Sequence, residues 1–307
     1  MPSRSNIQSP TLYPVDVSVI IPMYNAAKYI ENTLASLLQQ QKHGLKLEII
    51  VIDDVSTDNS REIVSKLSYP EVKLICLSQN GGSAQARNAG LARARGKWIQ
   101  FVDSDDSVCN DLYARFENYL EPQYNVYVFS LQIQYPNHTL CRTIREVKDK
   151  RAFGYFYAVW NLFIQRELCL PFNSISRQNE DVCFVFDMLI EKTLHIGFIP
   201  DAFYILNRTN EDSKMANFKT EQYLQMFRYV ASRIKQGDTL TRLFFVESFV
   251  GILFARELPL LMRIQVASKT LLRYWTYIPA VWRNGIRHCI ENKKVIQYPS
   301  PSTKTTP

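Results

Sequence analysis

The 307-residue sequence lacks paired cysteines, an apolar leader and a long uncharged hydrophobic run. Its six cysteines include no C-x-x-C pair, which argues against a disulfide framework or a zinc site and favours reduced thiols. The first 14 residues are polar and contain prolines, so they do not resemble a signal peptide. The most apolar stretch, residues 243–262, is interrupted by three charged side chains. We therefore expect a cytoplasmic protein without a membrane-spanning helix.

The positive charge is confined to one end of the chain. The formal net charge is +7, but residues 1–215 carry −2 and residues 216–307 carry +9. With 46% hydrophobic residues, the chain can build a sizeable core, which excludes a mainly disordered protein. Because the excess charge belongs to the C-terminal segment, the basic composition gives no reason to expect nucleic-acid binding by the main domain.

Alternating short β-branched runs and helical patterns predict an α/β fold with a mainly parallel sheet and helices on both faces. The predicted strands are residues 17–21, 47–52, 72–77, 98–102, 126–132 and 203–206. Helices are predicted between the first four strands and at residues 112–120, 153–167 and 181–191, with only helical patterns after residue 218. This gives a flexible N-terminus (1–14), an α/β domain (15–215), a basic helical region (216–297) and a disordered tail (298–307).

Polar residues follow each of the first four predicted strands, where the carboxyl ends of parallel strands form ligand sites. These segments are Tyr24-Asn25, Asp53-Asp54, Asn80-Gly81-Gly82 and Asp103-Ser104-Asp105-Asp106. Taken alone, each segment can also be explained by a purely structural role. The aspartate pair suits a turn, the glycines suit a turn followed by a surface Arg87, and the acidic cluster suits a cap for the next helix.

The acidic cluster of residues 103–106 is the most informative of these segments. Three carboxylates within four residues repel one another unless a cation neutralises them, and hard oxygen ligands without a nearby His or Cys favour Mg²⁺ or Mn²⁺. Such a cation would bridge to a substrate diphosphate. The cluster therefore predicts a divalent metal site.

Taken in order, these segments resemble the motifs of family 2 glycosyltransferases with the GT-A fold, which is Rossmann-like. The resemblance covers residues 15–215 and includes two further segments, Ala86-Arg87-Asn88-Ala89-Gly90 and Asn179-Glu180-Asp181. It implies transfer of a sugar from a nucleotide diphosphate, most often UDP, with inversion at the anomeric carbon.

The resemblance also implies roles for the residues at the donor site. Tyr24 would stack on uracil, Asp54 would accept the N3 proton of the base, and Arg87 would contact the nucleotide or its phosphates. Asp103 would hold ribose or donor sugar, and Asp105 would ligate the metal, which stabilises the departing UDP. The full set of expected donor residues is Pro22, Tyr24, Asn25, Asp53, Asp54, Asn80, Gly82, Arg87, Asp103, Ser104 and Arg208.

The acidic pair Glu180-Asp181 carries the general-base role in this family, usually through its second member. We expect Asp181 to remove the proton of the acceptor hydroxyl as an ionised carboxylate near a helix N-terminus, with Glu180 holding the acceptor or orienting the base. The alternative is a pair of plain helix N-terminal acids. Trp160 is a candidate acceptor contact or a core side chain, and Arg208 could cover the diphosphate or lie on the surface.

Two departures from the family pattern stand out. Val55 occupies a position after the aspartate pair that is usually Gly, so the turn must form without a permissive residue. The chain also lacks the common His in the later loop, which leaves Asp105 as the metal ligand.

The basic C-terminal region mixes Arg and Lys with Tyr and Trp, a combination that suits a membrane interface and a lipid-linked acceptor at the inner face of the membrane. The alternative is a helical region that packs on the main domain. Two other functions stay open at this stage, a nucleotidyltransferase that makes activated sugars and a non-catalytic nucleotide-binding module. The first would be expected to carry a Gly-rich loop after the first strand.

Overall fold

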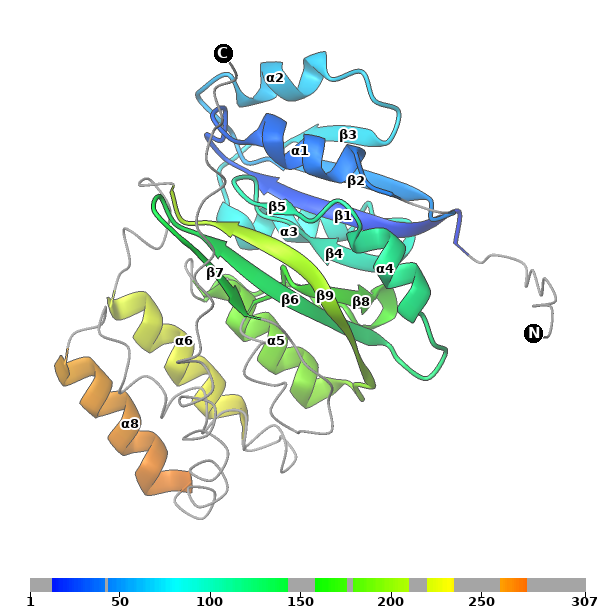
Figure 1. Cartoon of the computed structure of the whole chain (residues 1–307). Coiled ribbons are helices and arrows are strands. Elements are labelled where there is room, and N and C mark those ends of the chain that lie inside the picture. Colours follow the sequence, from blue (N-terminus) through cyan, green and yellow to red (C-terminus); the bar gives the residue numbers. More distant parts are fainter. Residues whose placement is uncertain are drawn as a thin grey trace, which may run out of the picture.

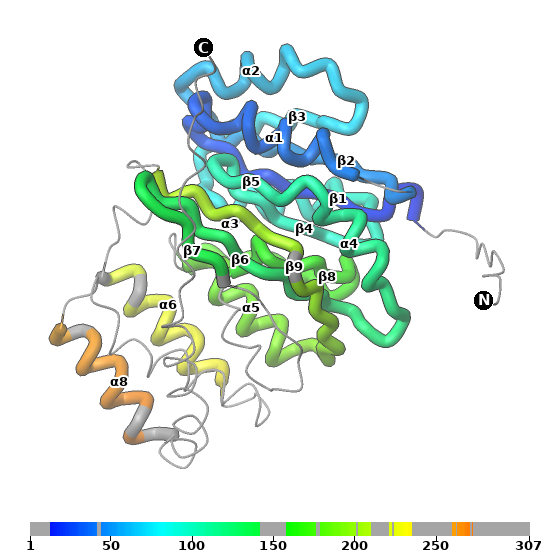
Figure 2. The backbone as a smooth tube through the Cα atoms, in the orientation of Figure 1, coloured from blue at the N-terminus to red at the C-terminus, as the bar shows by residue number. Residues whose placement is uncertain are grey.

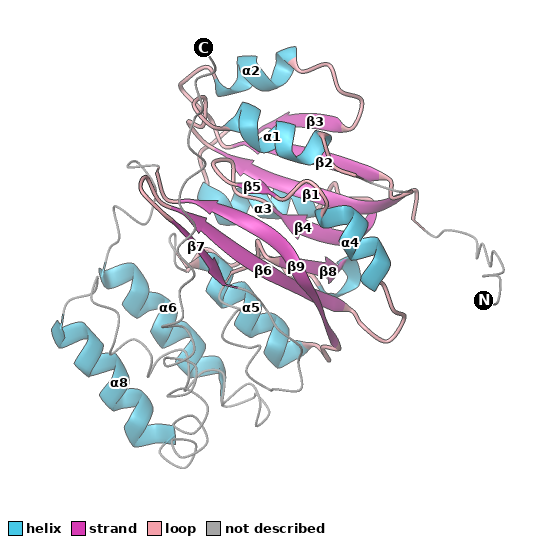
Figure 3. Ribbon diagram, in the orientation of Figure 1, coloured by secondary structure: helices cyan, strands magenta, loops and turns pink. Residues whose placement is uncertain are grey.

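The computed structural model describes residues 13–41, 44–142, 158–175, 179–209, 220–234 and 260–274. Within these ranges the chain forms a nine-stranded sheet in the order β3-β2-β1-β4-β8-β6-β9-β5, and β7 pairs with β6 (Figure 1). Helices lie against both faces of this sheet (Figure 3). The predicted α/β class is confirmed.

The first half of the sheet is parallel and follows the predicted alternation. Its strands are β1 (Val15–Met23), β2 (Leu47–Asp53), β3 (Val72–Cys76) and β4 (Gly96–Phe101). They alternate with α1 (Ile30–Leu38), α2 (Ser60–Lys66) and α3 (Gly82–Leu91). Every residue of β2 is buried, as expected for a parallel strand covered on both faces. The carboxyl ends of β1, β2 and β4 therefore meet at one edge.

The second half mixes strand directions. The short β5 (Ser107–Val108) leads into α4 (Leu112–Tyr119), followed by β6 (Val126–Gln134), β7 (Thr139–Arg142) and β8 (Leu162–Gln165). A 3-10 turn (Arg166–Leu168) precedes α5 (Glu180–Glu191), and β9 (Ile196–Asn207) runs parallel to β6. The last described helices are α6 (Thr220–Arg233) and α8 (Leu260–Tyr274). Figure 2 traces this path from blue to orange.

Two hydrophobic cores lie on opposite faces of the sheet because successive strand residues point to opposite sides. In β1, Val19 and Ile21 contribute to the core under α1 and α4, whereas Ile20 contributes to the core shared with α3 and α5. The second core continues to α6 and α8 through side chains such as Val230 and Val266. Both described C-terminal helices are thus packed on the α/β body.

One buried carboxylate interrupts the apolar interior at the other end of the strands. Glu48 accepts hydrogen bonds from the Ser18 hydroxyl (2.6 Å) and the Arg95 amide (2.7 Å), and it pairs with Lys73 at 3.0 Å. Burial alone would raise the pKa of Glu48, but these hydrogen bonds leave that pKa below its usual value. The carboxylate therefore joins β1, β2, β3 and the start of β4.

Several sequence predictions need correction. The helix predicted over residues 153–167 is wrong in its described part, because Leu162–Gln165 is a strand inserted between β4 and β6. Strand β9 is far longer than the predicted 203–206, and β5 and β7 were not predicted. Residues 1–12, 153–157 and 275–307 lie outside the described residues, so the flexible N-terminus, the disordered tail and the domain boundaries stay predictions. No helix in the described ranges is both long and apolar enough to cross a bilayer.

Candidate functional site

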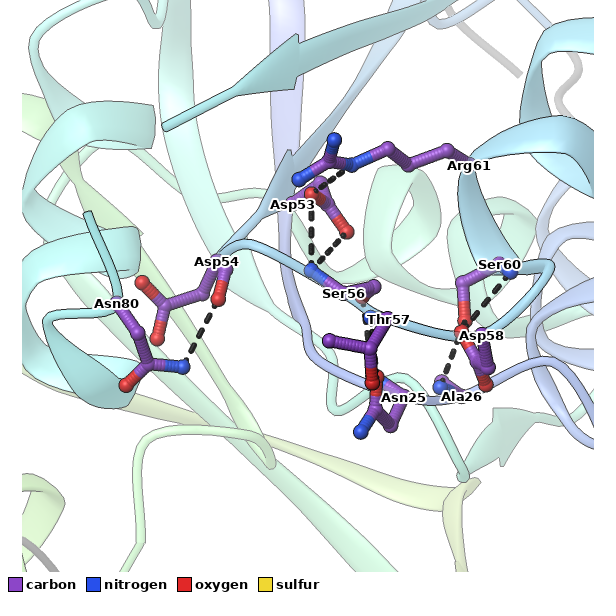
Figure 4. A network of polar contacts seen from close by, with 10 residues as sticks. All are labelled: Asn25, Ala26, Asp53, Asp54, Ser56, Thr57, Asp58, Ser60, Arg61 and Asn80. Atoms are coloured by element: carbon purple, nitrogen blue, oxygen red, sulfur yellow. Dashed lines mark hydrogen bonds and ion pairs between the residues drawn. The ribbon is translucent and has the colours of Figure 1, made fainter. Parts of the chain in front are cut away.

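The loops that follow β1 and β2 are joined side by side by hydrogen bonds (Figure 4). The Asn25 amide donates to the Ser56 hydroxyl (3.0 Å), and the Ala26 amide donates to the Ser60 hydroxyl (2.8 Å). In return, the Asn25 side-chain oxygen accepts from the Thr57 amide at 2.8 Å. Two amides of the loop between β1 and α1 are thus satisfied by side chains from the loop after β2 and from the first residue of α2. Asn25 has a structural role here, and its predicted donor contact stays a prediction.

Asp53 and Asp54 are both buried but have different partners. Asp53 accepts from the Ser56 amide and forms an ion pair with Arg61, so it fixes the turn between β2 and α2. The two oxygens of Asp54 accept the amides of Gly81 (2.8 Å) and Gly82 (2.7 Å). Asp54 therefore holds the loop after β3 against the loop after β2.

Val55 occupies the position where the sequence analysis noted a missing glycine. Its φ is +64°, which lies in the left-handed region that β-branched residues rarely adopt. The turn geometry is therefore retained without glycine, at a cost in backbone strain.

The remaining loop residues border an open edge. The Tyr24 side chain is 51% exposed, so its ring is available to a planar ligand, whereas Pro22 is buried within β1. The Asn80 side-chain amide donates to the Asp54 carbonyl at 2.9 Å (Figure 4). A cavity of about 170 Å³ is lined by residues 80–85 and Ser174. Gly82 adopts φ +77°, and a Cβ at this residue would meet nothing within 4 Å, so open space lies beside it.

The acidic loop after β4 divides into inner and outer carboxylates. Asp106 is buried and accepts from the Tyr204 hydroxyl and the Asn207 amide, both at 2.7 Å. The Tyr204 hydroxyl also accepts from the Asp103 amide at 3.0 Å. Burial, together with the charges of Asp103 and Asp105, holds the pKa of Asp106 well above its usual value. Asp106 therefore anchors the loop to β9 and is not available to a ligand.

Asp103 and Asp105 are the outer, half-buried carboxylates of this loop. Their hard oxygens suit Mg²⁺ or Mn²⁺, and their charges repel one another and Asp106, which a cation would relieve. Within the described ranges, no group of three or more His, Cys, Asp or Glu side chains is arranged to hold a metal ion. The residues fit a cation held by Asp105, alone or with Asp103, and completed by ligand oxygens.

Arg87 lies at the centre of the site and is only 4% exposed, so the surface-Arg alternative is wrong. Its Nη2 donates to Asp103 at 2.8 Å, and its Nη1 donates to Glu180 at 2.8 Å. Its guanidinium carbon also lies 5.5 Å from the centre of the Phe172 ring. Burial would lower the pKa of Arg87, but the charges of Asp103 and Glu180 raise it above its usual value. Both terminal nitrogens of Arg87 are engaged with protein carboxylates, and its predicted phosphate contact stays a prediction.

Glu180 and Asp181 form the first residues of α5, close to Arg87. Glu180 is buried and accepts from Arg87 and from the Ser83 hydroxyl of α3. Burial, followed by the charge of Glu180, raises the pKa of Asp181 to about 7, although Arg87 opposes this shift. Burial therefore opposes the ionisation expected for Asp181 at neutral pH, and the general-base role of Asp181 stays a prediction. The carboxyl is instead poised to gain or lose a proton near pH 7.

The segment that leads to α5 is fixed to α3 beside Arg87. The Asn88 side chain forms two hydrogen bonds with the Phe172 backbone, at 2.8 Å to the carbonyl and 2.7 Å from the amide. Further along, the Asn173 side chain donates to Asp187 of α5 at 3.2 Å. These contacts hold the start of α5 near the acidic loop.

Three predicted residues lie around this centre. Trp160 is half-buried and stacks on Tyr204 with 4.9 Å between ring centroids, so it supports the Asp106 anchor, and its acceptor role stays a prediction. Ser104 accepts from the Thr33 hydroxyl through its carbonyl (3.0 Å). Arg208 directly follows Asn207, the last residue of β9, whose amide binds Asp106. The Arg208 amide donates to the Gln134 carbonyl at 2.8 Å.

Sequence reasoning missed two contributors to the site. Tyr204 was expected only as part of a short strand, yet its hydroxyl connects two residues of the acidic loop. Ser83 was expected only as a helix residue, yet it binds Glu180. No sequence signal marks either residue, because each acts on a partner about 100 residues away.

Comparison with known proteins gives consistent matches. A model of the family described as Glycosyl transferase family 2 matches residues 18–177. An uncharacterized glycosyltransferase of Haemophilus influenzae is 30% identical over 188 residues, which cover 57% of this chain and 72% of that protein. The putative teichuronic acid biosynthesis glycosyltransferase TuaG of Bacillus subtilis is 44% identical over 92 residues, which cover 29% of this chain and only 36% of TuaG.

A solved structure gives a match over more of the chain. The crystal structure of S. aureus TarS residues 1–349 in complex with UDP-GlcNAc is similar with a TM-score of 0.65 and 21% sequence identity. The match covers 83% of this chain and 80% of the TarS chain. At 21% sequence identity, this match shows that the two proteins share a fold.

Proposed function

The chain belongs to glycosyl transferase family 2 and has the GT-A fold, and on this premise we propose that it is an inverting, UDP-sugar-dependent glycosyltransferase. It would transfer a hexosyl or N-acetylhexosaminyl group to a hydroxyl of a glycan or lipid-linked acceptor in cell-surface polysaccharide synthesis. The observation that carries this proposal is the buried Arg87, which connects Asp103 of the acidic loop to Glu180 beside the candidate base. This arrangement brings a donor-side carboxylate and an acceptor-side carboxylate to one place.

A uridine nucleotide is the proposed donor base. The exposed Tyr24 ring offers a stacking surface, and Tyr24 directly follows Met23, whose carbonyl accepts from the Asp54 amide at 2.8 Å. Each Asp54 oxygen accepts one hydrogen bond from a backbone amide, and a carboxylate oxygen has a second lone pair that can accept the N3 proton of uracil. TarS, which shares the fold, was solved with UDP-GlcNAc, and this supports a UDP-sugar as the donor. Donor contacts by Asp53 and Pro22 would be made through the backbone, because the Asp53 carboxylate is engaged by the Ser56 amide and Arg61, and the Pro22 ring is buried within β1.

Asp105 would hold Mn²⁺ or Mg²⁺ at the donor diphosphate, and Asp103 beside it would hold the ribose or the donor sugar. When bound, the cation stabilises the negative charge that develops on the leaving UDP. The Tyr204 hydroxyl binds Asp106 and the Asp103 amide, and these hydrogen bonds fix the loop after β4. The fixed loop holds the carboxylates of Asp103 and Asp105 in position. Arg208, directly after β9, would lie close to the same diphosphate.

Asp181 is the proposed general base of a single displacement. The acceptor oxygen forms a bond to the anomeric carbon while the bond from that carbon to the diphosphate oxygen breaks, which inverts the configuration. The proton of the acceptor hydroxyl passes to the Asp181 carboxylate. A pKa of about 7 suits this task, because the ionised form is populated at neutral pH and still attracts a proton. Glu180, held by Arg87 and Ser83, orients the helix start that carries the base.

A direct test measures UDP release from a panel of UDP-sugars with Mn²⁺ and a saccharide acceptor. We expect one or two donors to give turnover that requires the divalent ion, and the same donors to raise the melting temperature. Absence of binding to any uridine nucleotide, with or without metal, would contradict the proposed function. If a uridine nucleotide binds but Asp181→Asn transfers sugar at the wild-type rate, only the base assignment is wrong.

A further inference from the structure

Helix α8 carries a strip of large apolar side chains that face solvent. Leu260, Leu261, Ile264 and Leu272 are 61%, 82%, 49% and 81% exposed, respectively. Residues 260, 264, 268 and 272 are spaced four apart and therefore share one face of the helix, with Leu261 beside them. We refer to these four apolar residues as the α8 strip. Ser268 is the one polar residue among these positions, and its hydroxyl donates to the Gln265 carbonyl of the same helix. Single exposed leucines are ordinary, but four exposed apolar side chains on one helix face mark a contact surface.

The opposite face of α8 packs against the rest of the protein. Val266, Ala267 and Thr270 are almost fully buried, and Val266 belongs to the core that also contains Val230 of α6. The Thr270 hydroxyl is satisfied within the helix by the Val266 carbonyl at 2.9 Å. The helix is therefore fixed by one face, and the α8 strip is not needed to hold it in place.

The charge around the strip indicates the chemistry of its partner. Lys269 lies on α8 beside the strip and is exposed, and residues 216–307 carry 14 basic against five acidic side chains. Helix α8 itself carries three basic residues and no acidic one. A basic helix with exposed leucines suits the headgroup region of an anionic bilayer, where apolar side chains reach the acyl boundary. We propose that the α8 strip binds the surface of a membrane that contains anionic lipids.

The position of α8 leaves the strip facing away from the sheet. Helix α8 packs on α6, which in turn packs on α5, and Figure 1 shows α8 as the outermost of these three helices. The inference concerns a surface separate from the donor site and does not depend on which sugar is transferred.

The test compares the full-length protein and its variants in co-sedimentation with vesicles. One set contains phosphatidylcholine alone and the other contains phosphatidylcholine with phosphatidylglycerol. We expect the wild type to bind the anionic vesicles, and the double variant Leu261→Ser/Leu272→Ser to bind them roughly tenfold more weakly. Lys269→Glu should weaken binding by a few-fold at low salt only. Both leucines are more than four-fifths exposed, so their replacement leaves the core intact.

Tyr69→Ser provides the matched control, because Tyr69 is an exposed apolar side chain (48%) between α2 and β3, far along the chain from α8. It should bind vesicles as the wild type does. Equal binding by wild type and the double leucine variant would overturn the proposal, as would failure of the wild type to bind anionic vesicles. A lipid-free dimer in sedimentation velocity that the double variant abolishes would assign the strip to self-association and also overturn it. UDP binding is measured in parallel, so a failure of the donor assignment is seen separately.

Discussion

Arg87 and Glu180 lie 93 residues apart in the sequence and form a buried ion pair with 2.8 Å between Nη1 and Oε1. Both side chains are about 5% exposed. Because Arg87 also binds Asp103, one guanidinium joins the loop after β4 to the start of α5. A buried ion pair contributes little net stability when intact, but loss of one partner leaves a costly isolated charge.

Arg87→Met should therefore lower the free energy of unfolding by about 3 kcal/mol, measured by urea denaturation. Arg87→Lys should recover part of the loss, since it keeps the charge but not the planar fork that reaches two carboxylates. The control is Arg115→Met, which removes an exposed i,i+4 pair with Asp111 and should cost less than about 0.5 kcal/mol. Equal losses for Arg87→Met and Arg115→Met would show that the pair does not organise the site.

Asp181→Asn should lower kcat by roughly 10²- to 10⁴-fold, because the acceptor hydroxyl loses its base. In the wild type, the rate should rise with pH through about 7 and then level off as the carboxyl ionises. Glu62→Gln is the control, because Glu62 is a plain acid in the first turn of α2, and this variant should keep wild-type activity. A wild-type rate that is independent of pH between 5 and 8 would contradict the assignment.

The same carboxyl makes stability depend on pH. The Asp181 pKa is about 7 in the folded protein and near 3.8 in an unfolded chain, so ionisation favours the unfolded state. The wild type should lose stability as the pH rises from about 4, and the loss should be complete above about 7. Asp181→Asn should therefore exceed the wild type in stability at pH 8, by up to about 4 kcal/mol, and not at pH 4. Urea denaturation at the two pH values tests this, and a difference that is the same at both would contradict it.

Tyr204→Phe should loosen the acidic loop, because Asp106 and the Asp103 amide both lose their hydroxyl partner. We expect a stability loss of about 1–3 kcal/mol and a higher Mn²⁺ concentration for half-maximal activity. Tyr113→Phe is matched in burial and removes a hydroxyl that binds Gln100 inside the protein. It should also lose stability but leave the Mn²⁺ requirement unchanged. A similar shift in both variants would assign the effect to general destabilisation.

Val55→Gly should stabilise the protein by about 1 kcal/mol, because relief of strain at φ +64° exceeds the entropy that glycine adds to the unfolded chain. The control is Val72→Gly, which changes a half-buried strand residue to glycine and should be destabilising. Thermal unfolding of the two variants measures the difference. If Val55→Gly were destabilising by as much as Val72→Gly, the left-handed conformation would not be a source of strain.

The parallel half of the sheet could be predicted from the sequence because each strand and helix there carries a local pattern. The run Leu47–Asp53 is apolar and β-branched, and it is flanked by residues that favour turns. The same signal failed for Leu162–Gln165, because a short apolar run that is buried on both faces has no period that distinguishes a strand from a helix. Its identity depends on pairing with β4 and β6, which no local pattern records.

For the site, the sequence predicted which loops meet but not how individual side chains are buried and paired. It indicated which loops meet, because strand order and direction place Asp54, Asp103 and the loop after β3 at one edge. It could not separate Asp106, which is bound by Tyr204, from its neighbour Asp105 in the same run. It also could not foresee that Arg87 would be buried between two carboxylates, because burial is decided by the position of α5.

The side-chain caps that cross from one loop to the other make the first two loops of the site a single cooperative unit. Because Ser56 and Ser60 satisfy the amides of Asn25 and Ala26, opening the loop after β2 also leaves these two amides of the loop after β1 without a partner. Local unfolding of either loop alone would leave unpaired amides in the other, so the two should open together. Their amide hydrogens are therefore expected to exchange with solvent at a common rate, and a nucleotide that orders one loop would slow exchange in both.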